Sequence, residues 1–291
     1  MCKTLYIVGN GFDLAHGLET NLCCFKCYLK YKDDESRKFL ESISQYVPFN
    51  KTWSNFEEAL GNIDSNRIEE EAMDYAQSPS SDDYRDSSWS DPGYEASQAI
   101  AFSSKISEYL REWICSIRID RNYKFPIQKD AIFLSFNYTN TLEKNYDIPK
   151  DQICYIHGDC SKDEVLVCGH NDTSLLQKRV VEESDYSLQT QEVIDIIHEY
   201  YEETWKNPKE QINKNKFFFD QLSSIENIVI IGHSFENQVD DDYFVLIKEK
   251  VSSNCMWEIS CYSDKDKISN ESFARRIGLN RNNYSFFTVN N

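Results

Sequence analysis

Short apolar runs recur along the chain, and they are the first guide to its structure. The runs are five or six residues long and rich in Ile, Val, Phe and Tyr, as β-strands are. Stretches with helical spacing of apolar residues separate most of them. The pattern predicts strands at residues 4–8, 131–136, 152–156, 164–168, 227–231, 257–262 and 284–289.

Three runs are apolar at nearly every position, namely residues 3–8, 131–136 and 227–231. Only strands that helices cover on both faces can be apolar throughout, so we expect these to be central strands of a parallel sheet. Because helical stretches alternate with the strands, the pattern predicts an α/β fold with a Rossmann-like, doubly wound parallel sheet.

About 120 residues separate the first and second strands, far more than one crossover helix needs. We therefore expect a large helical insertion at residues 30–125, within a single domain that spans residues 1–291. A polar stretch rich in Ser, Asp and Pro, residues 78–93, is expected to be a mobile loop. Helices are expected at residues 28–46, 55–63, 67–76, 96–117, 188–205 and 208–222.

The charge balance narrows the class of ligand. Lys and Arg total 31 against 49 Asp and Glu, a net charge of -18, which would repel a nucleic-acid backbone. The opening apolar run meets glycine too early for a secretory signal, and no run approaches the roughly 20 residues of a membrane span. We therefore expect a soluble, cytoplasmic protein that binds neither nucleic acid nor membrane.

Ten cysteines are scattered along the chain, and in the cytoplasm they are expected to stay reduced. The spacing of Cys24 and Cys27 would suit two zinc ligands or a redox pair. No second pair at that spacing completes a four-cysteine site, and Cys160, Cys168 and His170 are irregularly placed. We expect no metal.

Gly9-Asn10-Gly11-Phe12-Asp13 follows the first predicted strand and opens a helix. Glycines let a backbone approach an anion closely, and the free N–H groups at the start of a helix attract phosphate. A structural turn would use the same glycines. The place of this turn, at the carboxyl end of the first parallel strand, favours a nucleotide, and NAD is the ligand that we expect. For Asp13 we favour a helix cap over a hydrogen bond to ribose.

Three later strands also end in small or polar residues. Asn137 follows the strand at 131–136, and His157 follows the strand at 152–156. Gly232, His233 and Ser234 follow the strand at 227–231. Each also has a plain explanation: Asn137 as a turn residue, His157 as a satisfied histidine beside a tight turn, and Gly232 as a glycine that packs against a helix. Because the carboxyl ends of parallel strands meet at one edge, their joint occurrence predicts one nucleotide pocket.

Five blocks of the chain resemble those of the bacterial phage abortive-infection AbiH family, in the same order. The opening block, residues 5–20, reads Leu-Tyr-Ile-Val-Gly-Asn-Gly-Phe-Asp-Leu-Ala-His-Gly-Leu-Glu-Thr and is the most specific. The others are Trp-Ser-Asn-Phe-Glu at 53–57, Phe-Asn-Tyr-Thr-Asn-Thr-Leu at 136–142, Ile-His-Gly at 156–158 and Gly-His-Ser at 232–234. The resemblance implies a role in defence against phage.

The order of these blocks is in turn similar to that of sirtuin-like NAD-consuming domains. This remote resemblance implies that Asn137 holds a water or the ribose and that His157 is a general base. It also implies that residues 232–234 line the adenosine side. The Gly-Ala-Gly opening of sirtuins is Gly-Asn-Gly here, and their zinc ribbon is absent. Hydrolysis of NAD is therefore expected rather than protein deacylation.

Hydrolysis of the nicotinamide–ribose bond needs an oriented water, a proton acceptor and an apolar wall. Asn137 can orient the water without titrating, and His157 can accept its proton near neutral pH. Phe12 or Tyr138 could pack on the nicotinamide ring. Glu57 is a further candidate carboxylate, although a solvated or capping role is favoured for it, and His16 has no assigned role.

The sequence thus predicts an NAD-binding and NAD-hydrolysing effector, with NAD as substrate or ligand. Two other classes stay open: a nucleotide sensor without turnover, and a protein-interaction module of a defence system. A protein partner and a phage-derived trigger are both compatible with the acidic chain and its helical insertion.

Overall fold

The computed structural model describes residues 3–77, 85–120, 122, 124–161, 165–181, 187–235 and 238–289. These residues form two compact units. The first comprises residues 1–21, 110–167 and 207–291, and the second comprises residues 22–109 and 168–206. Each unit is described by itself below.

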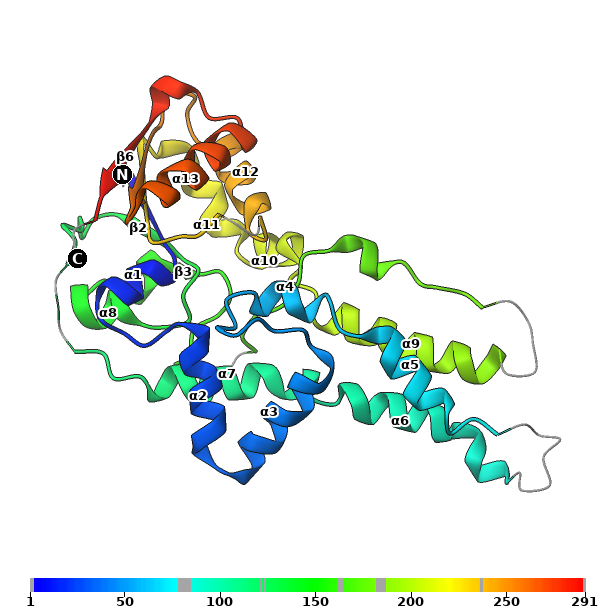
Figure 1. Cartoon of the computed structure of the whole chain (residues 1–291). Helices are drawn as coiled ribbons and strands as arrows, with labels where there is room; N and C mark the ends of the chain where they lie inside the picture. Colours follow the sequence, from blue (N-terminus) through cyan, green and yellow to red (C-terminus); the bar gives the residue numbers. More distant parts are fainter. Residues whose placement is uncertain are drawn as a thin grey trace. The chain divides into compact units, whose positions relative to one another are not determined.

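The first unit is built on a six-stranded sheet in which every neighbouring pair of strands is parallel (Figure 1). The order of strands is β3-β2-β1-β4-β5-β6. The strands are β1 (Thr4–Val8), β2 (Ile132–Ser135), β3 (Ile153–Tyr155), β4 (Asn227–Ile231), β5 (Met256–Cys261) and β6 (Tyr284–Thr288). The predicted Rossmann-like parallel sheet is confirmed, and the three most apolar runs are three adjacent strands, β2, β1 and β4.

Both faces of the sheet are buried, which explains why the central strands are apolar throughout. Leu5 and Ile7 contribute to one core cluster, together with the aromatic side chains of α11 (Lys216–Asp220), α12 (Asp241–Lys250) and α13 (Asp264–Arg276). Tyr6 and Val8 contribute to a second cluster on the opposite face, together with side chains of α1 (Asn10–Ala15) and α8 (Thr141–Tyr146). Successive strand residues point to opposite faces, so one short run supplies both cores.

Short helices connect the strands of the first unit. They are α1 (Asn10–Ala15), α8 (Thr141–Tyr146), α10 (Pro208–Lys214), α11 (Lys216–Asp220), α12 (Asp241–Lys250) and α13 (Asp264–Arg276). Single 3-10 turns complete the connections: η3 (Lys150–Gln152), η5 (Gln221–Ser224) and η6 (Arg281–Asn283).

The second unit is helical in its described residues and contains most of the predicted insertion. Its helices are α2 (Leu22–Lys32), α3 (Asp34–Tyr46), α4 (Phe56–Leu60), α5 (Ser65–Met73), α6 (Asp91–Ile100) and α9 (Ser187–Glu203), with η1 (Asp86–Ser90), η2 (Ser103–Lys105) and η4 (Thr173–Leu176). Helix α7 (Ile106–Ser116) begins in this unit and ends in the first. Helices α5, α6 and α9 lie side by side (Figure 1).

Three predicted helices are divided in the structure, and the one predicted at 208–222 forms α10, α11 and η5. The helix predicted at 28–46 breaks at Asp33, whose side chain accepts a hydrogen bond from the Ser36 amide and so starts α3 afresh. The helix predicted at 96–117 is divided into α6, η2 and α7. Helix α6 also begins earlier than predicted, at Asp91, because Pro92 suits the first turn of a helix.

The loop predicted at 78–93 is therefore wrong for its last residues, which belong to η1 and α6. Residues 78–84 lie outside the described part of the chain. No described helix is both long and apolar enough to cross a membrane.

The strand predicted at 164–168 is wrong for residues 165–168, and residue 164 lies outside the described part. These residues form a loop in which Leu166 is buried but Val165 is 77% exposed. The amide of Val167 donates to the carbonyl of His157, and the Val167 carbonyl accepts from the Tyr138 hydroxyl. The apolar run serves to pack one side chain against a turn and does not join the sheet.

Candidate functional site

The order of strands sets where a site can form in the first unit. β1 lies between β2 and β4, and the chain proceeds outward in one direction through β2 and β3 and in the other through β4, β5 and β6. In doubly wound sheets, ligands bind outside the carboxyl ends of the strands at the point where the order reverses. Here that point lies between the turns that follow Val8 and Ile231, which are paired in register.

These two turns are packed backbone against backbone. The Gly11 amide donates to the Gly232 carbonyl at 2.7 Å, and the Gly9 amide donates to the Ile231 carbonyl at 3.0 Å. A Cβ atom at Gly232 would lie 2.2 Å from the Phe12 amide nitrogen, and Gly232 also has a positive φ of 66°. Gly9 and Gly11 are restricted in the same way, because their Cβ atoms would meet the backbone of residues 232 and 233. The glycines therefore permit contact between two turns.

This packing uses the amides that were expected to face a phosphate. Gly9 and Gly11 donate to the turn after β4, and the Phe12 amide donates to the Gly9 carbonyl at 2.9 Å. The expectation that these three N–H groups are free is wrong, since each already has a backbone partner. The exposed residues of the two turns are Asn10 and Ser234. The Asn10 side-chain amide donates one hydrogen bond to the Thr20 carbonyl at 3.1 Å and keeps a second N–H for a ligand, and Ser234 offers a hydroxyl. A nucleotide-binding role for residues 9–13 stays a prediction.

Phe12 and His16 belong to the core and face no ligand site. Phe12 is completely buried and packs against His16, Phe125 and Tyr146. The His16 Nδ1 atom lies 2.7 Å from the Phe12 carbonyl, which can only accept, so Nδ1 carries the proton. Nε2 then accepts from the Tyr146 hydroxyl at 2.7 Å, and burial lowers the pKa of His16. Phe12 has no exposed face for a nicotinamide ring, so that interpretation is corrected.

Asp13 is a buried carboxylate that joins α1 to the turn after β2. Oδ2 accepts a hydrogen bond from the Thr139 hydroxyl and Oδ1 accepts one from the Thr141 hydroxyl, both at 2.7 Å. Gly9 is the N-cap of α1, so the favoured capping role of Asp13 is wrong. Burial raises the pKa of Asp13 to about 6, against hydrogen bonds from Thr139, Thr141 and Asn137 that lower it.

Asn137 lies at the mouth of β2, as predicted, and is buried. Its side-chain amide donates to the Gly9 carbonyl at 2.9 Å, and its backbone amide donates to the Ser135 hydroxyl at 3.2 Å. The sequence blocks at 5–20 and 136–142 are thus in contact. Asn137 bonds to Gly9, and Thr139 and Thr141 bond to Asp13. In this arrangement Asn137 positions the turn after β1.

His157 and His233 come together around a residue that the sequence analysis did not single out, Asp240. Nε2 of His157 lies 3.7 Å from Asp240 Oδ1, and Nε2 of His233 lies 3.6 Å from Asp240 Oδ2. The Phe136 ring packs against both imidazoles. The two histidine side chains are 3% and 6% exposed, and Asp240 is 16% exposed. Two strand ends and the start of α12 therefore form one cluster of titratable groups.

A carboxylate beside two imidazoles can support transfer of a proton. At these distances Asp240 stabilises a positive charge on either ring, and burial limits screening by water and salt. An imidazole so placed can take a proton from a water or hydroxyl group and later return it. The signal for Asp240 in the sequence was faint, because it opens the run Asp240-Asp241-Asp242 that precedes a helix, where acidic residues are common.

Glu57 lies in α4 of the second unit, where Lys206 Nζ, a buried cation, donates to its carboxylate at 2.9 Å. Its expected solvated or capping role is therefore corrected to a partly buried ion pair, in which the Glu57 side chain is 27% exposed. Cys24 and Cys27 lie one turn apart on α2 of the same unit. Among the described residues, no group of three or more His, Cys, Asp or Glu side chains could hold a metal ion.

A methyl group at Gly232 should destabilise the fold mainly because it would separate the turns after β1 and β4. We expect Gly232→Ala to reduce the free energy of unfolding by more than about 3 kcal/mol, because the Cβ atom meets backbone. Gly17→Ala is the matched control, since Gly17 has a φ of 78° but no atom within 4 Å of its Cβ position. It should cost only about 1 to 2 kcal/mol. Urea unfolding followed by circular dichroism measures both, and equal losses would contradict the packing argument.

The raised pKa of Asp13 should make stability depend on pH. The ordinary pKa is 3.8 and the folded value is about 6, so the folded state binds more protons between these values. Stability should therefore fall as the pH rises from about 4 to about 6, by roughly 3 kcal/mol relative to Asp13→Asn. The amide can still bond to both threonine hydroxyls.

Urea unfolding of the wild type and of Asp13→Asn at several pH values tests this expectation. Asp242→Asn, at an exposed position of α12, controls for the loss of one carboxylate. If the curves for the wild type and Asp13→Asn run parallel between pH 4 and 6, the buried carboxylate is not the cause.

Comparison with known proteins assigns a family to this chain. A model of the family described as "Bacteriophage abortive infection AbiH" matches residues 5–261, which include β2 to β5 and all of β1 but its first residue. Searches of curated proteins and of solved structures found no match. The chain belongs to the AbiH family of bacteriophage abortive infection proteins.

Proposed function

We propose that this AbiH chain is an effector of phage abortive infection that binds NAD and hydrolyses the bond between nicotinamide and ribose. The observation that carries the proposal is the cluster of His157, Asp240 and His233 at the carboxyl edge of the sheet. A role in abortive infection follows from membership of the AbiH family.

The order of strands supports a dinucleotide as the ligand. The sequence β3-β2-β1-β4-β5-β6 is the order in which Rossmann sheets bind dinucleotides across the reversal point. Asn10 and Ser234 are exposed on either side of that point and can donate to phosphate or ribose oxygens. His157 follows β3 and His233 follows β4, so both belong to the same edge.

The proposed reaction needs one water and yields ADP-ribose, nicotinamide and a proton. The water oxygen bonds to the anomeric carbon of the ribose as the bond to the nicotinamide nitrogen breaks, and that bond's electron pair leaves with neutral nicotinamide. His157 takes the proton of the water, and Asp240 stabilises the resulting imidazolium. His233 lies beside the other carboxylate oxygen, Oδ2, and holds Asp240 in place.

Removal of the base should nearly abolish turnover. We expect His157→Ala to lower the rate of nicotinamide release from NAD by about 10² to 10⁴, the usual contribution of a general base. Asp240→Asn should lower it in the same range, because the amide cannot stabilise the imidazolium. Asp242→Asn, at an exposed neighbouring position, should leave the rate unchanged.

The assay measures free nicotinamide by chromatography, with purified chain and in lysates of phage-infected cells that express each variant. The melting temperature of each variant separates loss of fold from loss of chemistry. If the wild type binds NAD but releases no nicotinamide in either setting, the hydrolase proposal fails and a nucleotide sensor remains. If NAD does not bind, both fail and an interaction module remains.

A further inference from the structure

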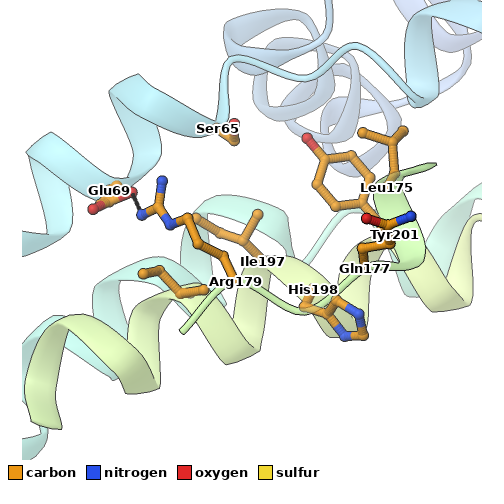
Figure 2. A pocket seen from close by; sticks show the side chains of 9 residues that line it. Ser65, Glu69, Leu175, Gln177, Arg179, Ile197, His198 and Tyr201 are labelled. Carbon is orange, nitrogen blue, oxygen red and sulfur yellow. Dashed lines mark hydrogen bonds and ion pairs between the residues drawn. The ribbon is translucent and has the colours of Figure 1, made fainter. Parts of the chain in front are cut away.

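The second unit contains a cavity that the proposed hydrolase does not use. It has a volume of about 130 Å³ and lies between α5, α9 and the chain at residues 175–179 (Figure 2). A closed cavity of about 150 Å³ holds one benzene molecule, so this slightly smaller pocket, which is open to solvent on one side, admits a single ring that stays partly exposed. The cavity is too small for a whole nucleotide, since sites for larger ligands occupy roughly 300 Å³ or more.

The walls of the cavity combine an apolar floor with a few hydrogen-bonding groups. Leu175, Ile194 and Ile197 contribute aliphatic surface, and Tyr201 contributes its ring. Ser65 and Tyr201, each with a hydroxyl group, also line the cavity. The side-chain amide of Gln177 also lines the cavity and offers both a donor and an acceptor (Figure 2). Flat apolar walls with a polar edge suit a heteroaromatic ring.

The cations around the cavity already have carboxylate partners. The guanidinium of Arg179 donates to Glu69, an ion pair that spans the cavity in Figure 2. Lys178 is paired with Asp195 at 3.1 Å. An anionic ligand would therefore have to displace a carboxylate of the protein, while an uncharged ligand meets no such competition. The charges favour an uncharged molecule.

Residues 175–181, which cover the cavity, are held on α9 by hydrogen bonds. The Gln191 side chain donates to the Arg179 carbonyl at 3.0 Å and accepts from the Val181 amide at 2.9 Å. The His198 ring hydrogen-bonds to the Leu176 carbonyl at 3.1 Å. A ligand would not have to order this segment, and a preformed pocket binds small ligands with less loss of entropy.

We infer that this cavity binds an uncharged, single-ring heteroaromatic amide, the chemical class of pyrimidine bases and pyridine carboxamides. The ring lies on Ile194, Ile197 and the face of Tyr201. Its amide edge exchanges hydrogen bonds with Gln177 and with the hydroxyls of Ser65 and Tyr201. The inference concerns the second unit and does not depend on NAD hydrolysis in the first.

Isothermal titration calorimetry of the full chain tests the inference with four probes. Uracil and nicotinamide carry the ring and the amide edge. Nicotinate has nearly the shape of nicotinamide but a negative charge, and toluene has the ring without the polar edge. We expect uracil or nicotinamide to bind at least about tenfold more tightly than nicotinate and toluene. Tighter binding of nicotinate, equal binding of toluene, or no binding of either amide would overturn the inference.

Variants locate the binding in this cavity. Gln177→Leu and Tyr201→Phe each remove one polar partner and should weaken binding about fivefold to tenfold. Gln98→Leu, at an exposed glutamine of α6, is the matched control and should bind like the wild type. His157→Ala should also leave binding unchanged, which separates this site from a product site of the proposed hydrolase. Equal affinity in Gln177→Leu, Tyr201→Phe and Gln98→Leu would refute the assignment.

Discussion

The absence of side chains at Gly9, Gly11 and Gly232 is the constraint on which the edge of the sheet depends. Only there can the turn after β1 donate directly to the turn after β4, with Gly11 and Gly232 joined by a hydrogen bond of 2.7 Å. A single Cβ atom would hold the two strand ends apart. The contact lies where α1 begins, and it holds the turn that contains His233 against the turn after β1. The glycine pattern, which resembles a phosphate-binding loop, thus has a structural role: it lets the turns after β1 and β4 come into direct backbone contact.

A second buried contact ties α1 to the neighbouring turn. Asp13 accepts from two threonine hydroxyls of the turn after β2, and Asn137 donates to the Gly9 carbonyl. Desolvation makes this carboxylate costly to ionise, as its raised pKa indicates. The polar residues of the edge therefore divide into two groups. Asp13 and Asn137 hold the turns together, while His157, Asp240 and His233 form the cluster able to move a proton.

Much of the fold could be predicted from residue pattern, because burial on both faces leaves an unmistakable signal. β1 and β4 have the predicted bounds, β6 differs by one residue at one end, and β2, β3 and β5 differ by one residue at each end. The predicted elements were wrong where a specific side-chain contact outweighs the hydrophobic pattern. Asp33 divides a helix because its side chain caps a new one, and residues 165–168 are apolar because Leu166 packs beneath a turn. Neither contact can be inferred from hydrophobic spacing alone.

For the candidate site, the sequence by itself determined which strands end in polar residues and that these ends share one edge, since parallel strands all leave the sheet on the same side. Only the tertiary structure decided which side chains meet there. It brings Asp240, at the start of α12, to two histidines from different strand ends, and it buries Phe12 and His16 in an aromatic cluster. Side-chain partners far apart in sequence depend on helix packing, which no local pattern encodes.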